Sequence, residues 1–380
     1  MARGSGEGTI YKRKVDGVWC GQIDFGRDPN TGRRLRKSIY GSTKREVRAK
    51  MLDMMQKYHN RQINLENVNL IDWMYRWLNT YKKPKLRPRT YQSYESIIRV
   101  HIAEIGNYTV KKLKPITIQR FINSKSEGLS KRRIKYILTV LKAGLEQAVI
   151  NNLITQNPAK HIEIPANTKP KKKSRAFTIS EQAKFLDQAQ NAYYGNLFIF
   201  ALETGLRRGE ILALKWSDVK LEEKAVLIRR GIVEVKQDGK YTLIEQPPKT
   251  EASKRELPLT TTAIKILKKQ KIKQLELKVK LGSEFNDYDL VFSTSTGNYI
   301  YPRNILRAYY KILEQAGIEK CGMHTLRHTF ATRLIEQNAN PKVVQSLLGH
   351  SDISMTMNIY AHVLPDKKSE TIALLEQIKY

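Results

Sequence analysis

The 380-residue sequence contains little cysteine, few acidic residues and no long apolar run. Its two cysteines, Cys20 and Cys321, lie far apart and form no CxxC pattern, which favours reduced thiols over a disulfide framework. No stretch approaches the roughly 20 apolar residues that a membrane-spanning helix needs. The N-terminal segment MARGSGEGTIYKRK also lacks the apolar core of a signal peptide. These absences predict a cytoplasmic protein without a membrane partner.

The shortage of acidic residues leaves a large positive charge. Lysines and arginines number 68 against 36 aspartates and glutamates, which gives a formal net charge of +32 at pH 7. A globular protein with this imbalance repels itself unless a polyanion lies against it. Nucleic acid is the default polyanion, and an anionic membrane surface is second. The 41% apolar content is enough to bury real cores, and the length predicts two or three domains.

Two kinds of phosphate chemistry lack their usual sequence signatures. The chain has no Walker loop to hold a nucleotide and no cluster of aspartate and glutamate to hold magnesium. We therefore expect neither a cofactor nor a metal ion.

Residues 1–62 form the first predicted domain. Strand-like runs on both sides of Asp16-Gly17 indicate a hairpin, and a third, basic strand follows with Arg34 and Arg36 as candidate DNA contacts. Thr43-x-x-Glu46 is typical of a capping box that opens a helix. The predicted buried stripe of this helix consists of Val47, Met51, Met54, Met55 and Tyr58. Three basic strands and one helix are enough for a small DNA-binding module, because a sheet can lie in a groove.

Residues 65–165 form a second, wholly helical domain. Four segments carry apolar residues at three- and four-residue spacing, and cations crowd their outer faces. A single cation on a helix is usually just solvated, but four such faces together favour contact with DNA phosphates. The candidate contacts are Arg87, Arg89, Lys131, Arg132 and Arg133.

Residues 166–177 form a basic linker, and residues 178–380 form the third domain. The linker has no apolar periodicity, and its Lys171, Lys172 and Lys173 suggest that it follows a nucleic-acid backbone. The third domain is predicted to contain helices over 180–190 and 195–215, a hairpin around Asp238-Gly239, a third strand or loop over 249–259, and further helices from about 260. The predicted fold class is multidomain and mainly α with small β-sheets: an N-terminal three-stranded sheet plus a helix, a helical domain, and a mixed α+β domain.

Four of the seven histidines lie in the last 60 residues, and three chemistries compete for them. His324 and His328, four residues apart, resemble half of a helical zinc site. Arg327 between them would repel a metal cation and no glutamate base accompanies them, which disfavours zinc. The second interpretation is structural, and it leads for His328 and His362. Gly349, directly before His350, is typical of a helix C-cap.

The third interpretation is metal-free phosphoryl transfer. Attack on a phosphodiester concentrates negative charge on two non-bridging oxygens, which planar guanidinium groups match in bidentate fashion. Arg207 and Arg327 could form this clamp, and Lys249 could protonate the departing 5′-oxygen as a general acid. His324 and His350 could donate hydrogen bonds to the phosphoryl group or assist proton transfer.

Tyr360 is the candidate nucleophile in this interpretation. A phenol with a pKa near ~10 is a poor nucleophile unless surrounding cations help it to ionise, and we expect Tyr360 to have such surroundings. Met355 and Met357, between His350 and Tyr360, are expected to serve packing.

In this order the motifs resemble those of the tyrosine recombinases, and within them the integrases of temperate phages and conjugative transposons. The resemblance covers nearly the whole chain and implies an arm-binding domain, a core-binding domain and a catalytic domain. The motifs are TGLRRGE around Arg207, PKT around Lys249, HTLRHTFAT with His324 and Arg327, LLGHSD with His350, and MNIYAHV with Tyr360. By position these six residues match the catalytic set of the family, and Glu210 matches a usually acidic supporting position.

The resemblance also implies a reaction and its partners. It implies a 3′-phosphotyrosyl intermediate, a free 5′-hydroxyl, strand exchange through a Holliday junction and a tetramer on double-stranded DNA. The ten-residue step from His350 to Tyr360, where many members have nine, is common in transposon-type integrases. Further expected partners are an excisionase and a host DNA-bending protein, and the expected location is the bacterial nucleoid. Residues 366–380 are expected to form a short amphipathic helix that docks either on its own domain or on a neighbouring protomer.

Two alternative functions stay open at this level. The chain could be a DNA-binding or architectural protein that has lost catalysis, or a nicking-closing enzyme similar to a type IB topoisomerase. A pure binder has no need of Tyr360 together with Lys249 and two arginines, which argues against the first. The separate N-terminal module and the helix after Tyr360 argue against the second.

Overall fold

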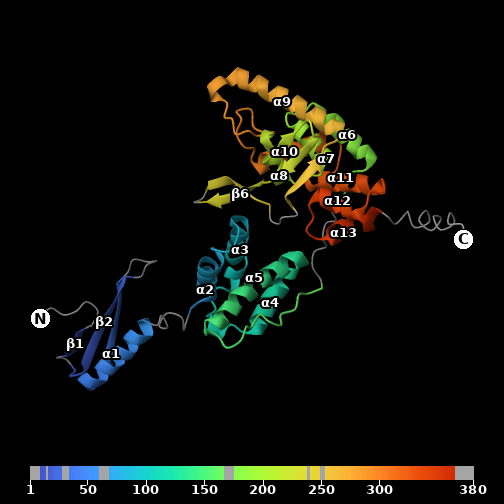
Figure 1. Ribbon diagram of the computed structural model, residues 1–380. Coiled ribbons are helices and arrows are strands. Elements are labelled where there is room, and N and C mark those ends of the chain that lie inside the picture. Colours follow the sequence, from blue (N-terminus) through green and yellow to red (C-terminus); the bar gives the residue numbers. More distant parts are fainter. Residues whose placement is uncertain are drawn as a thin grey trace. The chain divides into compact units, whose positions relative to one another are not determined.

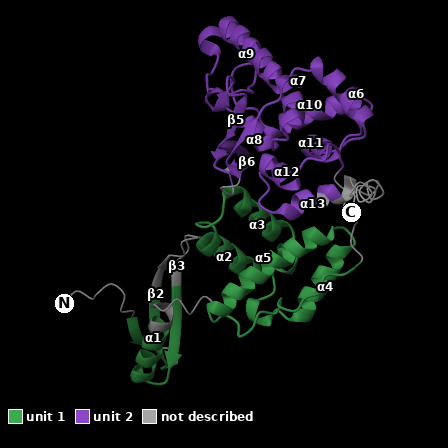
Figure 2. Cartoon of the chain, turned by 45° about the vertical axis from the view of Figure 1, so that its right-hand side comes forward, with its two compact units in different colours: residues 1–171 green, residues 172–380 purple. Residues whose placement is uncertain are grey.

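The computed structural model describes residues 9–13, 16–27, 34–59, 68–166, 175–237, 240–248 and 253–363 (Figure 1). The chain divides into two compact units, residues 1–171 and 172–380 (Figure 2). In the described ranges helices dominate and three small antiparallel sheets accompany them, so the predicted fold class is confirmed. Among the described helices, none has the length and apolarity to cross a membrane.

Unit 1 contains a three-stranded antiparallel sheet covered by one helix. Strands β1 (Thr9–Lys12), β2 (Trp19–Arg27) and β3 (Arg34–Gly41) lie in the order β1-β2-β3, and α1 (Lys44–His59) follows. Gly17 has φ +69° in the first turn, a conformation that favours glycine. Val47 and Met51 of α1 are buried against the sheet, as the stripe predicted, while the side chain of Tyr58 lies outside the described residues.

The start of α1 differs in detail from the predicted capping box. The Glu46 N–H donates to Thr43 Oγ1 at 3.2 Å, as expected. The Glu46 carboxylate accepts from the Ser42 N–H at 2.9 Å and the Ser42 hydroxyl at 2.8 Å, one residue further back than the standard motif. The carboxylate therefore fixes the turn between β3 and α1.

The predicted helical region of unit 1 consists of four main helices around one core. These are α2 (Leu70–Trp77), α3 (Pro88–Val100), α4 (Pro115–Ser126) and α5 (Lys131–Ile150), with a short π-helix, η1 (Leu78–Lys82), and two 3-10 helices, η2 (Ile102–Ile105) and η3 (Val110–Lys112). Trp73 and Trp77 are buried in this core, and the Trp73 indole donates to the Gly144 carbonyl at 2.8 Å. A Cβ at Gly144 would lie 2.3 Å from Met74 Sδ, so α2 and α5 pack too closely for any side chain there.

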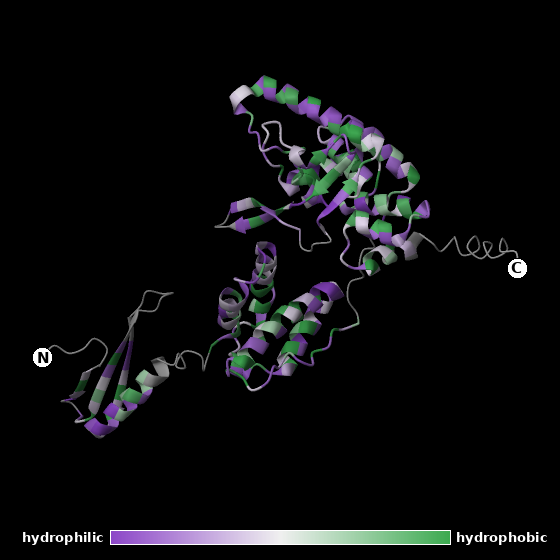
Figure 3. Cartoon of the chain, viewed as in Figure 1, coloured by the Kyte–Doolittle hydropathy of each residue, from purple (hydrophilic) through white to green (hydrophobic). Residues whose placement is uncertain are grey.

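Unit 2 is mainly helical, and its core gathers aromatic side chains. Phe177, Phe185, Phe198 and Tyr309 pack in ring contacts at its centre. Along α9, apolar and polar residues alternate (Figure 3). The helices are α6 (Ile179–Gln190), α7 (Gly195–Thr204), α8 (Arg208–Leu212), α9 (Thr261–Leu281), α10 (Pro302–Gln315), α11 (His324–Glu336), α12 (Pro341–Leu348) and α13 (Ile353–Val363), with turns η4 (Trp216–Asp218) and η6 (Gly282–Glu284).

The strands of unit 2 form two small sheets. One has the order β4 (Val219–Lys220), β5 (Ala225–Ile228), β8 (Arg255–Pro258), and the other is the hairpin β6 (Gly231–Gln237)–β7 (Lys240–Gln246). The predicted hairpin is confirmed, although its turn residues 238 and 239 lie outside the described residues. The returning segment, β8, pairs with β5 and not with the hairpin. Residues 229 and 230 separate β5 from β6, and there Arg230 pairs with the buried Asp218 at 2.6 Å.

The predicted helix over 195–215 is wrong as a continuous element. It stops at Thr204, where Gly205 adopts φ +61°, and restarts as α8. A Cβ at Gly205 would lie 2.4 Å from the Phe330 ring, so the close approach of α11 requires glycine at this break. The predicted helix 366–380 lies outside the described residues.

Candidate active site

The break after α7 turns Arg207 out of the helix and makes it the N-cap residue of α8. The Arg207 N–H donates to one Glu210 oxygen at 3.0 Å, and Arg207 Nη1 donates to the other at 2.7 Å. Arg207 Nη2 donates to the Gly349 carbonyl at 2.8 Å. Its side chain remains 35% exposed while that of Glu210 is 9% exposed, so the guanidinium is fixed by protein groups and still open to a ligand.

Arg327 lies on α11 and is the more deeply buried guanidinium, 3% exposed. Its Nη1 donates to the Gly205 carbonyl at 2.9 Å and its Nη2 to the Leu348 carbonyl at 2.7 Å. Among the described residues, no carboxylate lies within ion-pair distance of it. Burial, and then repulsion from Arg207, lower the pKa of Arg327 to about 9. The site therefore holds a cation that lacks its own counter-ion.

Arg255, at the start of β8, joins the same cluster and was not predicted from the sequence. Its Nη2 donates to Glu210 at 3.1 Å, and its Nε donates to the Leu347 carbonyl at 2.7 Å. Arg255 and Arg207 hold the pKa of Glu210 below its usual range even though burial opposes this shift. Glu210 thus stays ionised between two guanidiniums and accepts hydrogen bonds from both.

His350 follows the left-handed cap of α12, where Gly349 has φ +62°, as the C-cap prediction requires. The His350 ring is buried, and its Nδ1 lies 2.9 Å from the hydroxyl of Thr356 on α13. Burial, followed by Arg327 and Arg207, lowers the pKa of His350 to about 4. His350 is therefore a neutral imidazole at pH 7, able to donate or accept one hydrogen bond at each nitrogen.

His324 and His328 pack edge to face, with ring centroids 4.8 Å apart. Burial, and then His328 and Arg327, lower the pKa of His324 to about 4, although the residue as a whole is exposed. Burial and Arg327 also lower the pKa of His328. No three His, Cys, Asp or Glu side chains of the described residues are placed to hold a metal ion. The pair is thus an aromatic contact at the beginning of α11.

The depressed pKa of His350 predicts a stability that depends on pH. The unfolded chain binds a proton at this histidine below about pH 6.5, whereas the folded protein binds it only below about pH 4. The free energy of unfolding should therefore fall as the pH drops through this window, by about 2 kcal/mol for this group between pH 7 and pH 5. Urea unfolding at both pH values measures it. His350→Gln should lose this part of the pH dependence, whereas His161→Gln, at an exposed histidine, should keep it. Equal pH dependence in both variants would contradict the assignment.

Tyr360 lies on α13, is 8% exposed, and donates its hydroxyl hydrogen to the Ala339 carbonyl between α11 and α12. Burial raises the pKa of Tyr360, and none of the described cations contributes to lowering it. The expected cations of the described residues therefore do not surround this hydroxyl. The packing role predicted for Met355 and Met357 is also wrong, because they are 48% and 46% exposed.

Thr356 is a further residue that sequence reasoning missed. It is fully buried, and its hydroxyl contacts His350. Thr356 and Tyr360 are four residues apart on α13, so they lie on the same face of the helix. That spacing was the available signal: a polar side chain one turn before the candidate nucleophile.

The predicted DNA contacts of unit 1 fall partly on the first turn of α5. Ser130 caps this helix, and Arg132, Arg133 and Tyr136 line a pocket there. Arg133 Nη2 lies 3.4 Å from His101 Nε2. Arg87 is the N-cap residue of α3, Arg89 follows in its first turn, and Lys131 opens α5. Arg36 is exposed and pairs with Asp24 at 3.4 Å.

Several candidates fall where the structure gives no description. Lys249 and the linker residues Lys171, Lys172 and Lys173 lie outside the described residues, as do the side chains of Arg34 and His362.

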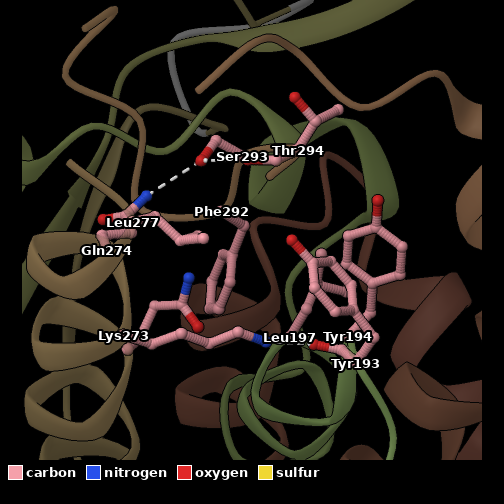
Figure 4. Close-up of a pocket in the computed structure, with 10 residues that line it drawn as sticks. Tyr193, Tyr194, Leu197, Lys273, Gln274, Leu277, Phe292, Ser293 and Thr294 are labelled. Atoms are coloured by element: carbon pink, nitrogen blue, oxygen red, sulfur yellow. Dashed lines mark hydrogen bonds between the residues drawn. The ribbon is translucent and has the colours of Figure 1, made fainter. Parts of the chain in front are cut away.

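A pocket in unit 2 lies between the start of α7, helix α9 and residues 292–294 (Figure 4). Its polar groups satisfy one another: Gln274 Nε2 donates to the Ser293 hydroxyl at 3.1 Å, and Lys273 Nζ donates to the Tyr193 carbonyl at 2.7 Å. None of the candidate catalytic residues that the structure describes lines it. The arginine cluster, and not this pocket, is the candidate site.

Comparison of the sequence with known proteins points to one family. The model of the phage integrase family matches residues 169–367, and that of the phage integrase N-terminal SAM-like domain matches residues 69–126. A protein of Caldanaerobacter subterraneus subsp. tengcongensis named "Tyrosine recombinase XerC-like" is 37% identical, covering 97% of this chain and 98% of its own. The ICEBs1 integrase of Bacillus subtilis is 25% identical, covering 97% and 99%.

Solved structures share the fold. The Tn1549 transposon integrase in complex with a circular intermediate DNA gives a TM-score of 0.68 at 19% identity, covering 81% of this chain and 99% of that one. A lambda integrase tetramer bound to a Holliday junction gives a TM-score of 0.57 at 19% identity, covering 94% and 96%.

Proposed function

This chain belongs to the phage integrase family of tyrosine recombinases, and on that premise we propose that its arginine cluster cleaves a DNA phosphodiester with Tyr360 as the nucleophile. The protein is a site-specific DNA recombinase of the integrase type, which integrates and excises a mobile element.

One observation carries the assignment: positive charge exceeds negative charge in the arginine cluster of unit 2. Arg207 and Arg255 share the carboxylate of Glu210, while the buried Arg327 donates to the Leu348 carbonyl and has no carboxylate of the described residues within ion-pair distance. Buried charge without a partner is strongly unfavourable, so such a cluster calls for an anion. A phosphodiester supplies one negative charge on two oxygens, which planar guanidiniums match. Of the two arginines proposed to clamp the phosphate, Arg207 is the more exposed, so an incoming phosphate reaches it first.

In the proposed reaction the Tyr360 oxygen forms a bond to the scissile phosphorus, and the bond from phosphorus to the 5′-oxygen breaks. The products are a 3′-phosphotyrosyl link and a free 5′-hydroxyl. The 5′-oxygen takes its proton from Lys249, the proposed general acid. A neutral imidazole, at His324 or His350, accepts the phenol proton or donates a hydrogen bond to the phosphoryl group. Attack by a 5′-hydroxyl on the phosphotyrosyl link rejoins the strand.

The Tyr360 hydroxyl has to leave the Ala339 carbonyl before it can react. A carbonyl oxygen accepts a hydrogen bond but does not take a proton, so the bond to Ala339 keeps the phenol neutral. Thr356 connects the same helix to His350. Movement of α13 on DNA would therefore shift the nucleophile and a phosphate-binding group together.

The direct test is a nicked suicide substrate, on which the cut cannot be rejoined because the short 5′ fragment diffuses away. We expect wild-type protein to accumulate a covalent protein–DNA adduct in the presence of EDTA, because the proposed attack, charge stabilisation and proton transfer use protein side chains. The adduct is measured by denaturing gel electrophoresis. A strict requirement for a divalent cation would contradict the proposed chemistry.

We propose the domain assignment predicted from the sequence. Residues 1–62 bind arm-type DNA sites, residues 65–165 bind the core site, residues 166–177 link them to the catalytic domain, and residues 178–380 perform catalysis. Two features support it: the exposed Arg36 on the N-terminal sheet and the basic first turn of α5, where helix N–H groups also favour phosphate.

Removal of residues 1–62 should separate the two DNA-binding roles. We expect binding to arm sites to weaken at least ~10-fold, because the phosphate contacts of the basic sheet are lost. Adduct formation on an isolated core site should stay within about threefold of wild type. Gel-shift titration and the suicide substrate measure the two effects. Complete loss of core-site cleavage would contradict the modular assignment.

We further propose that the recombinase acts as a homotetramer on double-stranded DNA, with residues 366–380 exchanged between protomers. An excisionase and a host DNA-bending protein would set the direction of the reaction. The proposed location is the cytoplasm, at the bacterial nucleoid.

A further inference from the structure

We propose that Arg255 is a positioning residue of the active site, which fixes Glu210 against the turn that precedes His350. The proposal rests on the function assigned above to Arg207, Arg327 and His350. It concerns a residue outside that catalytic set, on a strand that contributes none of its members.

The contacts of Arg255 join three separate segments of unit 2. Its Nη2 donates to Glu210 Oε2 at 3.1 Å on α8, and its Nε donates to the Leu347 carbonyl at 2.7 Å on α12. Its Nη1 donates to the Ser253 carbonyl at 3.1 Å, two residues before β8 begins. One planar group therefore holds α8, β8 and the end of α12 together.

The end of α12 shows why this contact matters for the site. Three successive carbonyls each accept from a different arginine: Leu347 from Arg255, Leu348 from Arg327, and Gly349 from Arg207. The last carbonyls of a helix lack partners within the helix and carry partial negative charge, so cations are favoured there. The three guanidiniums are thereby spaced by the helix end itself, directly before His350.

Exposure separates the role of Arg255 from that of Arg207. The Arg255 side chain is 6% exposed against 35% for Arg207, although both donate to the same carboxylate. The nitrogen atoms of Arg255 are all engaged with protein oxygens. Arg255 therefore acts on the substrate only through Glu210 and the helix end, while Arg207 remains accessible to a phosphate.

Lysine cannot reproduce this arrangement. An ammonium group is a single point of charge. The planar guanidinium of Arg255 instead donates in two directions, to Glu210 and to the Leu347 carbonyl. Arg255→Lys would keep the charge beside Glu210 and lose the contact to the end of α12. Arg255→Met would lose both and keep most of the side-chain volume.

The experiment uses the full chain and single-turnover adduct formation on the suicide substrate at saturating DNA. We expect Arg255→Met to slow cleavage about 10- to 100-fold, Arg255→Lys to fall between it and wild type, and the Kd for DNA to stay within about threefold. Arg333→Met is the matched control, since Arg333 also joins a carboxylate, Glu336 at 2.7 Å, to a carbonyl, that of Phe177 at 2.8 Å. Once folded, it should cleave at the wild-type rate.

A second substrate tests the route by which Arg255 acts. A sulfur in place of the bridging 5′-oxygen leaves without a proton, so it restores variants whose defect lies in the general acid. We expect it to leave the Arg255→Met defect in place, because that defect lies in the phosphate clamp. Recovery on this substrate would overturn the proposal and assign Arg255 to anchoring the segment that carries Lys249. If Arg333→Met slowed cleavage as much as Arg255→Met, the proposal would be overturned, because both defects would then reflect a loss of stability of the fold.

A double variant that combines Arg255→Met with Glu210→Gln tests whether Arg255 acts through Glu210. If Arg255 acts through Glu210, the two substitutions together should slow cleavage much less than the product of their separate effects. Independent effects would overturn the proposal. Normal cleavage by Arg207→Lys would instead show that the assigned site itself is wrong, so the two failures are distinguishable.

Discussion

Tyr360→Phe protein should bind its core site with the affinity of wild type and form no covalent adduct. The substitution removes only the oxygen that is proposed to bond to phosphorus, so cleavage should fall by at least ~10³-fold. The loss of the hydrogen bond to the Ala339 carbonyl should change stability by only about 1 kcal/mol. Gel-shift titration and the suicide substrate measure binding and adduct formation separately.

Tyr301→Phe is the matched control for this prediction. The Tyr301 hydroxyl also donates to a backbone carbonyl, that of Tyr241 at 3.2 Å, but it lies outside the arginine cluster. This variant should form the adduct at the wild-type rate. An adduct that persists in Tyr360→Phe protein would move the nucleophile to another residue.

Arg207→Lys protein should cleave about 10²- to 10³-fold more slowly than wild type while it binds DNA within a few-fold of the same affinity. Arg207 donates to Glu210 and to the Gly349 carbonyl with its two terminal nitrogens. A lysine ammonium keeps the positive charge but cannot keep both contacts and face a phosphate in bidentate fashion. Stabilisation of the charge that develops during attack is therefore lost, whereas attraction for the DNA backbone stays.

Arg175→Lys provides the comparison. Arg175 has a similar exposure, 34%, and also donates to a carboxylate, that of Glu181 at 2.6 Å, outside the arginine cluster. Its substitution should leave cleavage at saturating DNA unchanged. If Arg207→Lys lowered binding and cleavage in equal measure, Arg207 would serve only to position DNA.

Much of the local structure could be predicted from the sequence because it depends on neighbouring residues. The turn at Gly17, the helix that follows Thr43 and the left-handed cap at Gly349 all follow from the conformations that these residues favour. The helix over 195–215 could not be predicted correctly, because its break at Gly205 is imposed by the Phe330 ring of a distant helix.

The same division holds for the site. The sequence identified Arg207, Arg327 and Glu210 by residue type and motif, and these three residues lie in one cluster. It did not single out Arg255, whose partners lie far away in the chain, and the one-turn spacing of Thr356 from Tyr360 was a signal that it did not use. It also failed to predict that the Tyr360 hydroxyl contacts the Ala339 carbonyl in the free chain.

The sequence by itself determined three properties of this protein. These are the excess of positive charge, the local elements, and the presence of side chains able to transfer a phosphoryl group. Only the tertiary structure decided which of these groups meet, which are buried and what each donates to. The physical reason is that conformational preference acts between near neighbours. The partner of a buried guanidinium is chosen instead by the packing of helices and strands that are remote in sequence.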